Sequence, residues 1–300
     1  MLRYTLRQIE YALTVHEHGS VARASEQLGV AQPTLSAAIA KLEDQLGLQL
    51  FIRHHAQGVS ATPQAVRFFA EARNLLNHAQ DMQRETDAAG TAVEGTLTIG
   101  SFTTIAPAFA PQLIAGFSRQ YGKTVLRLEE GTQDWLLEGL RGGRHDVSLL
   151  YDIDMPGDIA LTRLAELEPH ILLPKAHRLA KKKRVSLAEI GKEPLILLDI
   201  APSRTYFTRV LQSAGIEPLV AFSSPSLEVV RGLVGQGLGY SILITRPHGD
   251  HAYAGEALAV LPIAEKVEKG VIALATLKQM RKTRLVKAFE DYCRSYFEKL

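Results

Sequence analysis

Residues 20–53 constrain the fold more than any other part of the chain, because they are typical of two short helices joined by a tight turn. Ser20 is a preferred N-cap residue for the first helix, and Gly29 suits the left-handed position that ends it. Pro33 fits the first turn of the second helix, where its missing N–H costs nothing. The second helix has one apolar face, formed by Leu35, Ile39, Leu42 and Leu46. This pattern predicts a helix-turn-helix, whose second helix enters the major groove of DNA.

The polar side chains of the second helix lie mostly off its apolar face, where they can reach DNA. Gln32 can pair bidentately with adenine, and Thr34 and Ser36 can reach base edges or phosphate. Arg53 lies beyond the second helix, so we expect it to contact mainly the DNA backbone. The predicted DNA-binding residues are Ser20, Gln32, Pro33, Thr34, Ser36, Lys41, Arg53 and His54.

A wing and a long helix are predicted next. Residues 54–62 are polar and contain a glycine, as expected for a β-hairpin. Thr62 can cap a helix over residues 63–89, roughly 40 Å long at 1.5 Å per residue. Its heptad-like apolar seam has two rows, Ala65, Ala72, Ala79 and Thr86 in one and Phe68, Leu75, Met82 and Ala89 in the other. We expect this seam to pair with a second copy, because alanine permits close approach; burial against its own domain is the alternative.

Strand-like and helix-like segments alternate after a Gly-containing hinge near residues 88–95. The predicted strands cover residues 96–100, 124–129, 147–151, 171–173, 195–198, 220–223, 240–244 and 271–277. The predicted helices cover residues 110–119, 133–141, 204–213, 227–234 and 282–300. Such alternation predicts parallel sheets covered by helices, and two such series predict two lobes with a cleft between them.

The N-terminal motifs resemble those of the LysR-type transcriptional regulators. The residues that carry the resemblance are Gly19-Ser20, Ala24, Leu28, Gln32-Pro33-Thr34-Leu35-Ser36, Ile39, Leu42-Glu43, Leu46-Gly47 and Leu50-Phe51-x-Arg53. Beyond this region the resemblance rests on length and order of elements. One departure is that the family's usual glycine after the wing threonine is missing, since the chain reads Thr62-Pro63-Gln64-Ala65.

The resemblance implies an α/β protein with an N-terminal all-α winged helix-turn-helix, a long linker helix and a two-lobed effector domain like the periplasmic binding proteins. The implied domains are residues 1–61, 62–92 and 93–300, with lobe I at about 93–162 and 269–300 and lobe II at about 163–268. The chain is expected to cross between the lobes near residues 160–165 and to return near 261–268. The resemblance also implies a homodimer paired through the linker helix and a tetramer built as two such dimers, which would touch two half-sites and bend the DNA between them.

Two strand-to-helix junctions are candidates for the effector site, because ligands bind at the carboxyl ends of strands in α/β folds. Each junction offers hydroxyl groups and backbone N–H groups, and the second adds a guanidinium, which suits a small carboxylate or similar anion. The candidate residues are Ser101, Thr103, Thr104, Ser203 and Arg204, with Thr132 and Ser226 as weaker candidates. Plain helix capping is the alternative for the serines and threonines, and Arg204 can instead pair with a local acid.

Composition excludes several other classes of protein. The net charge is only +2, and residues 1–61 hold five basic and five acidic side chains, so the DNA interpretation depends on the motif. The sequence contains no apolar run long enough to span a membrane. Polar residues interrupt its first residues, so we expect no secretory signal, and Cys293 is the single cysteine, so we expect a cytoplasmic protein. The histidines have no cysteine near them, so we expect no metal and no cofactor. No catalytic arrangement can be named from spacing, so we expect no enzyme activity.

We therefore predict a DNA-binding transcriptional regulator whose activity responds to a small-molecule effector. Its expected partners are double-stranded promoter DNA, the effector, further copies of the chain and RNA polymerase, but no membrane. Two alternatives stay open: an α/β solute-binding or enzymatic protein with an N-terminal interaction module, and a DNA-organising protein without a ligand.

Overall fold

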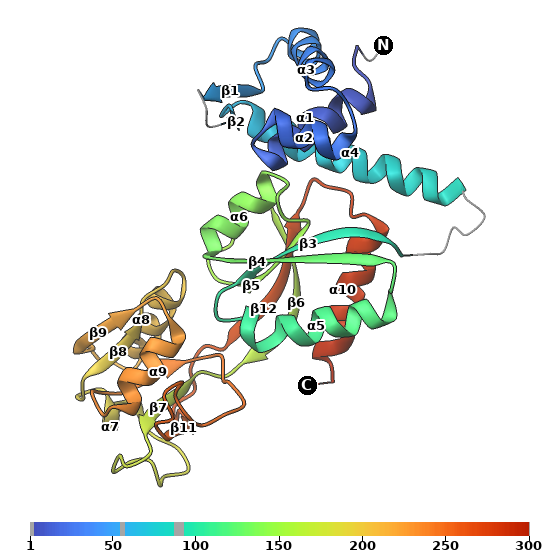
Figure 1. Ribbon diagram of the computed structural model, residues 1–300. Helices are drawn as coiled ribbons and strands as arrows, with labels where there is room; N and C mark the ends of the chain where they lie inside the picture. The colour runs from blue at the N-terminus through green and yellow to red at the C-terminus, as the bar shows by residue number, and fades with distance from the viewer. Residues whose placement is uncertain (1–2, 55–57, 87–92, 300) are drawn as a thin grey trace.

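A computed structural model of the chain describes residues 3–54, 58–86 and 93–299. A small helical domain with a β-hairpin lies above a two-lobed α/β domain, and a long helix runs between them (Figure 1). Across the described ranges, every helix is too short or too polar to cross a lipid bilayer.

The N-terminal domain is a winged helix-turn-helix. Its elements are α1 (Leu6–His18), α2 (Val21–Leu28), α3 (Gln32–Leu46), β1 (Phe51–His54) and β2 (Gly58–Ala61). The Ser20 side chain accepts from the backbone N–H of Arg23 and so caps α2, and Gly29 ends that helix with φ of 63°. β1 and β2 pair antiparallel as the predicted hairpin. Leu35, Ile39 and Leu42 are buried, which confirms the predicted apolar face of α3 for these three residues.

The linker helix α4 spans Ala65–Thr86 and presents two different apolar faces. It begins two residues later than predicted, and the predicted end at residues 87–89 lies outside the described residues. Ala65 and Phe69 are buried against the N-terminal domain of the same chain, and Phe68 packs against the same cluster. Leu75 is 42% exposed and Met82 is 65% exposed. The predicted seam is therefore divided between an intrachain contact and a stripe that faces outward.

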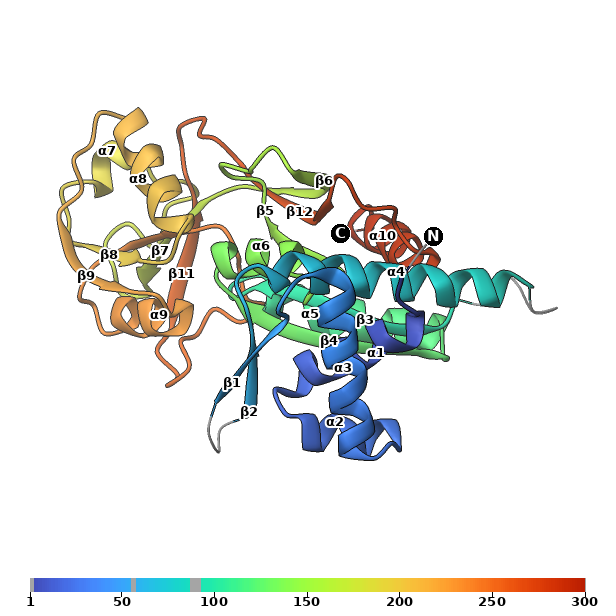
Figure 2. The same cartoon turned by 90° about the horizontal axis from the view of Figure 1, so that it is seen from above.

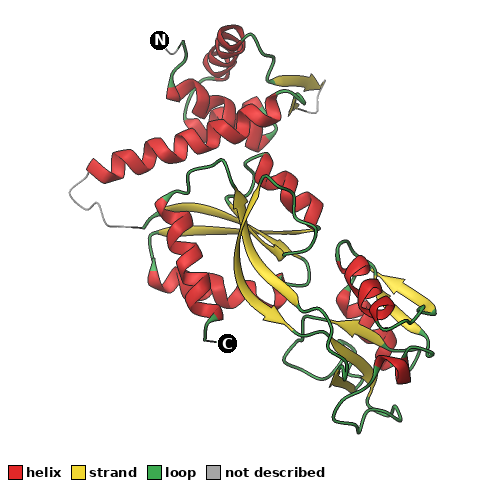
Figure 3. Cartoon of the chain, turned by 180° about the vertical axis from the view of Figure 1, so that it is seen from behind, coloured by secondary structure: helices red, strands yellow, loops and turns green. Residues whose placement is uncertain are grey.

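Lobe I is built on a five-stranded sheet of order β4-β3-β5-β12-β6. Its strands are β3 (Gly95–Phe102), β4 (Thr124–Gly131), β5 (Val147–Tyr151), β6 (Ile159–Leu167) and β12 (Gly270–Leu277). Its helices are α5 (Ala106–Gln120), α6 (Gln133–Arg141) and α10 (Arg284–Phe297). α5 and α10 pack together on one face of the sheet, and α6 covers the other (Figures 1 and 3).

Lobe II contains two smaller sheets. Its strands are β7 (His170–Pro174), β8 (Leu195–Leu198), β9 (Val220–Ser224), β10 (Ser241–Leu243) and β11 (Leu258–Pro262). Its helices are α7 (Leu187–Ile190), α8 (Ser203–Ser213) and α9 (Leu227–Gly235). β7 pairs antiparallel with β10 and β11, and β8 pairs parallel with β9.

The expectation of purely parallel sheets is wrong. Only β3, β4 and β5 run parallel in lobe I, while β12 is antiparallel to both β5 and β6. The expected lobe crossing at residues 160–165 lies inside β6, which pairs with β12 along residues 159–167. The chain therefore enters lobe II only after Leu167, and it returns between Pro262 and Gly270. These strands come from segments that link the lobes, so their direction does not follow the βα alternation.

Candidate DNA interface and effector site

The predicted base-reading residues lie at the amino end of α3. Gln32, Pro33 and Thr34 are exposed there, and Ser36 is half-buried. α3 and the β1–β2 hairpin project on the same side of the molecule (Figure 2). The arrangement presents a helix and a wing together, as a winged helix-turn-helix requires for binding in the major groove and along the backbone.

The other predicted DNA-binding residues surround α3. Ser20 is partly exposed and caps α2. Lys41 is exposed in the second half of α3, and Arg53 and His54 are exposed on β1. His54 Nε2 lies 2.7 Å from Ser60 Oγ across the hairpin. Arg53 and Ser36 line one groove of about 250 Å³ between α3 and the hairpin, so the wing and the helix share a concave surface.

Glu43 explains how the wing is held beside α3. Its Oε1 accepts hydrogen bonds from the backbone N–H groups of Leu50, at 2.7 Å, and Phe51, at 3.1 Å. This carboxylate is therefore engaged by the start of β1, although Glu43 also lines the groove that Ser36 and Arg53 share. Glu17 is likewise engaged, in an ion pair with Arg73 at 2.8 Å. Two of the five acidic side chains in residues 1–61 are thus held in contacts within the chain. Their negative charges therefore offset less of the positive charge that is available to DNA.

The first of the two candidate junctions lies at the carboxyl end of β3. Ser101 is fully buried and its hydroxyl has no hydrogen-bond partner among the described residues; the same holds for the Thr103 hydroxyl oxygen. The Thr104 hydroxyl lies 3.3 Å from the Tyr151 hydroxyl. Buried polar groups are normally paired, so unpaired hydroxyls gathered at a strand end indicate a place where a ligand or water supplies the partner.

The second junction, at the start of α8, differs from the first. Ser203 is buried, at 5% exposure. Arg204 is exposed and forms an ion pair with Asp199, which supports the alternative that it pairs with a local acid. The weaker candidates Thr132 and Ser226 are exposed N-caps of α6 and α9. Their hydrogen bonds are those of ordinary helix capping.

Two contacts join the lobes near these junctions. The Tyr151 hydroxyl, at the end of β5, lies 2.5 Å from the hydroxyl of Thr245, just after β10 of lobe II. Arg209 of α8 lies 3.9 Å from Asp154 in the loop after β5. β5 is the neighbour of β3 in the sheet, so the β3 junction and α8 lie on facing sides of the two lobes.

Three polar residues of this region were not predicted from the sequence: Gln133, Tyr151 and Thr245. Tyr151 ends a predicted strand, and the strand-end rule that selected Ser101 also applies to it. Gln133 follows Thr132 directly, but its burial could not be seen from spacing. Thr245 has no sequence signal, because its contact is between lobes.

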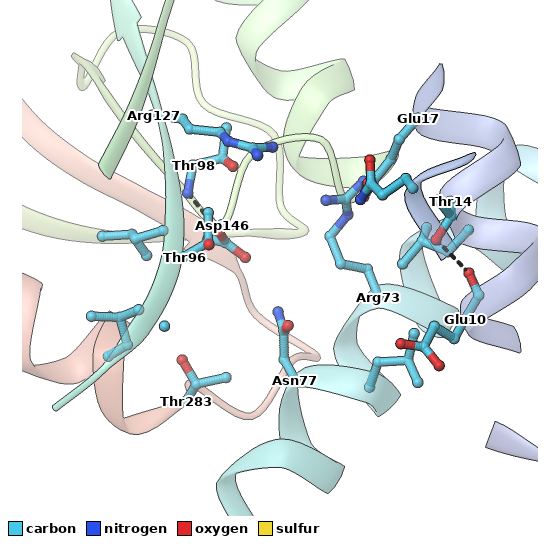
Figure 4. Close-up of a pocket in the computed structure, with 16 residues that line it drawn as sticks. Glu10, Thr14, Glu17, Arg73, Asn77, Thr96, Thr98, Arg127, Asp146 and Thr283 are labelled. Atoms are coloured by element: carbon cyan, nitrogen blue, oxygen red, sulfur yellow. Dashed lines mark hydrogen bonds and ion pairs between the residues drawn. The ribbon is translucent and has the colours of Figure 1, made fainter. Parts of the chain in front are cut away.

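A separate cavity of about 390 Å³ lies between the N-terminal domain and lobe I (Figure 4). One wall carries Glu17 of α1 and Arg73 of α4, and the other carries Thr98, Arg127 and Asp146 of lobe I. The backbone N–H of Thr98 donates to Asp146 Oδ2 at 2.7 Å. Burial raises the pKa of the Asp146 carboxyl, and the backbone hydrogen bond and Arg73 oppose that rise.

The linker helix also packs directly on lobe I beside this cavity. Gly143 has φ of 66°, and a Cβ atom there would lie 2.8 Å from the Cα of Ala70 in α4. Asn74 donates to the sulfur of Met280 at 2.9 Å. The linker helix is therefore docked on lobe I through close backbone approach and a polar contact. Within the described residues, no group of His, Cys, Asp and Glu side chains is arranged to hold a metal ion.

These features define a class of protein: a winged helix-turn-helix, joined by a long helix to a two-lobed α/β domain, is a DNA-binding transcriptional regulator with a ligand-binding domain. Family comparisons agree. Residues 6–66 match the bacterial regulatory helix-turn-helix of the lysR family, and residues 90–298 match the LysR substrate binding domain. The chain belongs to the LysR family of transcriptional regulators, which are not enzymes.

Individual relatives match along almost the whole chain. HinK, a LysR family transcriptional regulator from Pseudomonas aeruginosa, is 43% identical, with 98% of each chain covered and a TM-score of 0.68. A full-length OxyR variant from the same organism is 28% identical, with 97% of this chain and 98% of that chain covered and a TM-score of 0.79. YybE, an uncharacterized HTH-type transcriptional regulator of Bacillus subtilis (strain 168), is 28% identical over 97% of this chain and 98% of its own length.

Proposed function

We propose that a small organic anion binds between the carboxyl end of β3 and the start of α8, and that it regulates DNA binding by α3 and the wing. The observation that carries the proposal is the fully buried, unpaired hydroxyl of Ser101 beside the contact between the lobes. Thr103, Thr104 and Ser203 add hydroxyl groups to the same region. The effector would act only to the extent that it binds two lobe arrangements with different affinity.

Strands β3 and β5 connect this site to the DNA-binding domain. Ser101 lies three residues after Thr98 in β3, and Asp146, which accepts from the Thr98 backbone, directly precedes β5. Thr98 and Asp146 line the cavity that faces Arg73 of the linker helix. A change at the carboxyl ends of β3 and β5 can therefore reach α4 through two adjacent strands, which are rigid elements.

On the DNA side, we propose that Gln32, Pro33, Thr34 and Ser36 contact bases or phosphate, and that Arg53 contacts the backbone. Lys41, Ser20 and His54 are proposed as flanking contacts. The exposed stripe of Leu75 and Met82 supports a homodimer formed through α4, and two such dimers would form the tetramer. RNA polymerase is the proposed partner in transcription.

A thermal-shift screen of small carboxylic acids tests the effector proposal, because a ligand that binds only the folded state raises the melting temperature. Ser101→Ala should reduce the shift produced by an active acid. Thr5→Ala is the matched control, since it removes an exposed capping hydroxyl from α1 in the N-terminal domain and should leave the shift unchanged. A shift that Ser101→Ala does not alter would place the effector elsewhere.

A further inference from the structure

A glutamine of lobe I has a buried side-chain oxygen that accepts no hydrogen bond from the hydroxyl groups of the site. Gln133 is the first residue of α6 and is only 6% exposed. Its Nε2 donates to the backbone carbonyl of Ile153 at 2.9 Å, while its Oε1 has no hydrogen-bond partner in the described part of the chain. The Ile153 carbonyl can only accept, so the amide nitrogen must point toward it. The unpaired atom is therefore the oxygen.

Sheet topology places this amide at the proposed effector site. β4 ends at Gly131, two residues before Gln133, and β5 ends at Tyr151, two residues before Ile153. β3 lies between β4 and β5, and all three run parallel. The Gln133 side chain thus reaches across the carboxyl end of β3, which is where Ser101 and Thr103 carry their own unpaired hydroxyls.

We propose that Gln133 accepts a hydrogen bond from the effector, and that the effector is an organic acid bearing a hydroxyl or amino group. This inference rests on the proposed function of the same site. Serine and threonine hydroxyls can donate to a carboxylate, but a carboxylate has no proton to give to the Gln133 oxygen. An acid without a donor group would leave that oxygen buried and unpaired, which costs binding free energy. A hydroxy or amino acid satisfies both requirements.

The charges nearby favour the same class of ligand. Arg204, the cation that the sequence offers at the second junction, is engaged by Asp199. Arg209 of α8 faces Asp154. Recognition therefore depends mainly on neutral hydroxyl and amide groups, whose directional hydrogen bonds distinguish a hydroxylated acid from its parent acid more sharply than a cation would.

Matched pairs of acids test the proposal on the full chain by ligand-observed NMR titration. The pairs are L-lactate with propionate, L-malate with succinate, and L-alanine with propionate. In at least one pair, the member with the donor should bind about tenfold more tightly, the effect of one satisfied hydrogen bond. Gln133→Met, checked for native folding by circular dichroism, should abolish that preference. Ser101→Ala should weaken both members of the pair and preserve the ratio.

The outcomes separate this inference from the proposed function. Acids that bind with equal affinity within every pair would overturn the requirement for a donor and leave an organic-anion site intact. A preference that survives in Gln133→Met would overturn the role of Gln133. If none of these acids binds to the unmodified protein, the proposal of an organic-acid effector fails together with this inference.

Discussion

The hydroxyl of Tyr151 in lobe I lies 2.5 Å from the hydroxyl of Thr245 in lobe II. The Thr104 hydroxyl extends this chain of hydroxyls on the lobe I side, at 3.3 Å from Tyr151. Burial raises the pKa of the Tyr151 phenol, so it stays protonated and can donate. This hydrogen bond joins the two lobes at the end of β5, and β5 is the neighbour of β3 in the sheet. A ligand at the end of β3 would therefore bind beside a contact that fixes how the lobes meet.

Tyr151→Phe should lower the free energy of unfolding by about 1 kcal/mol, the net contribution of one hydrogen bond. Thr245→Val should have a similar effect, and the double variant should cost less than the sum of the two, because both changes remove the same bond. Urea unfolding measures the three values. Tyr253→Phe is the control, since Tyr253 is 95% exposed and should tolerate the change. Strict additivity would show that the two hydroxyls do not interact.

Gln32→Ala should cost about 1–3 kcal/mol of binding at the operator and relax sequence preference, as expected for the loss of a base contact. Arg53→Ala should instead weaken binding to all sequences alike and reduce the salt slope by about one, because it removes a backbone contact. Footprinting and salt titration distinguish the two effects. Gln212→Ala, on exposed α8 surface, should change neither. Unchanged operator preference in Gln32→Ala would remove this residue from base readout.

Leu75→Asp or Met82→Asp should dissociate the dimer and weaken operator binding, because each puts a charge on the exposed apolar stripe of α4. A charge kept dry at such a contact costs several kcal/mol. Light scattering reports the mass and operator titration reports the affinity. Arg67→Asp is the control, because it changes the charge at an exposed α4 position that is already polar. Dimers of normal affinity in both stripe variants would mean that the chains associate elsewhere.

Local signals predicted the elements well. The predicted helix over residues 133–141 and the strands over 147–151 and 195–198 have these same bounds in the structure, because caps and short apolar runs define them locally. β6 and β11 escaped prediction. β6 is half-buried with polar residues along its length, and it is stabilised by pairing with β12, more than a hundred residues away. Such pairing leaves no local pattern.

The candidate site likewise contains residues that local sequence signals predict and residues that depend on long-range contacts. The buried hydroxyl of Ser101 lies where the strand-end rule predicts a ligand. The roles of Gln133 and Thr245 depend on which strands are neighbours and on how two lobes meet, and neither can be read from spacing. Part of the predicted linker seam, at Ala65 and Phe68, is likewise covered by the chain's own N-terminal domain, since heptad spacing does not identify the partner.

Arg73→Met should reduce the effect of the effector on operator affinity while leaving effector affinity itself nearly unchanged. Arg73 pairs with Glu17 and lines the interdomain cavity, and it is not among the proposed effector contacts. Coupling between two sites is a free energy separate from either affinity, so it can be lost alone. Calorimetry with an active acid, with and without operator DNA, measures both quantities. Equal coupling in Arg73→Met and the unmodified protein would exclude this route.

Acidification should destabilise the protein through His170, a buried residue at the start of β7. Burial, aided by Arg246 and Arg231, lowers its pKa to about 4. The unfolded chain, with an ordinary pKa near 6.5, takes up the proton first, so this contribution to stability is complete above pH 6.5 and is lost as the pH falls toward 4. The expected loss from this residue is about 2.5 kcal/mol between pH 7.5 and pH 4.5.

His170→Gln should flatten the pH dependence by about that amount, even if it lowers stability at pH 7.5. Urea unfolding at the two pH values gives the slope, which separates titration from a simple packing defect. Burial also lowers the pKa of His145 and His16, so part of the slope should survive in this variant. His248→Gln, at an exposed position, should keep the full slope. A slope as steep in His170→Gln as in the unmodified chain would show that another group takes up the proton.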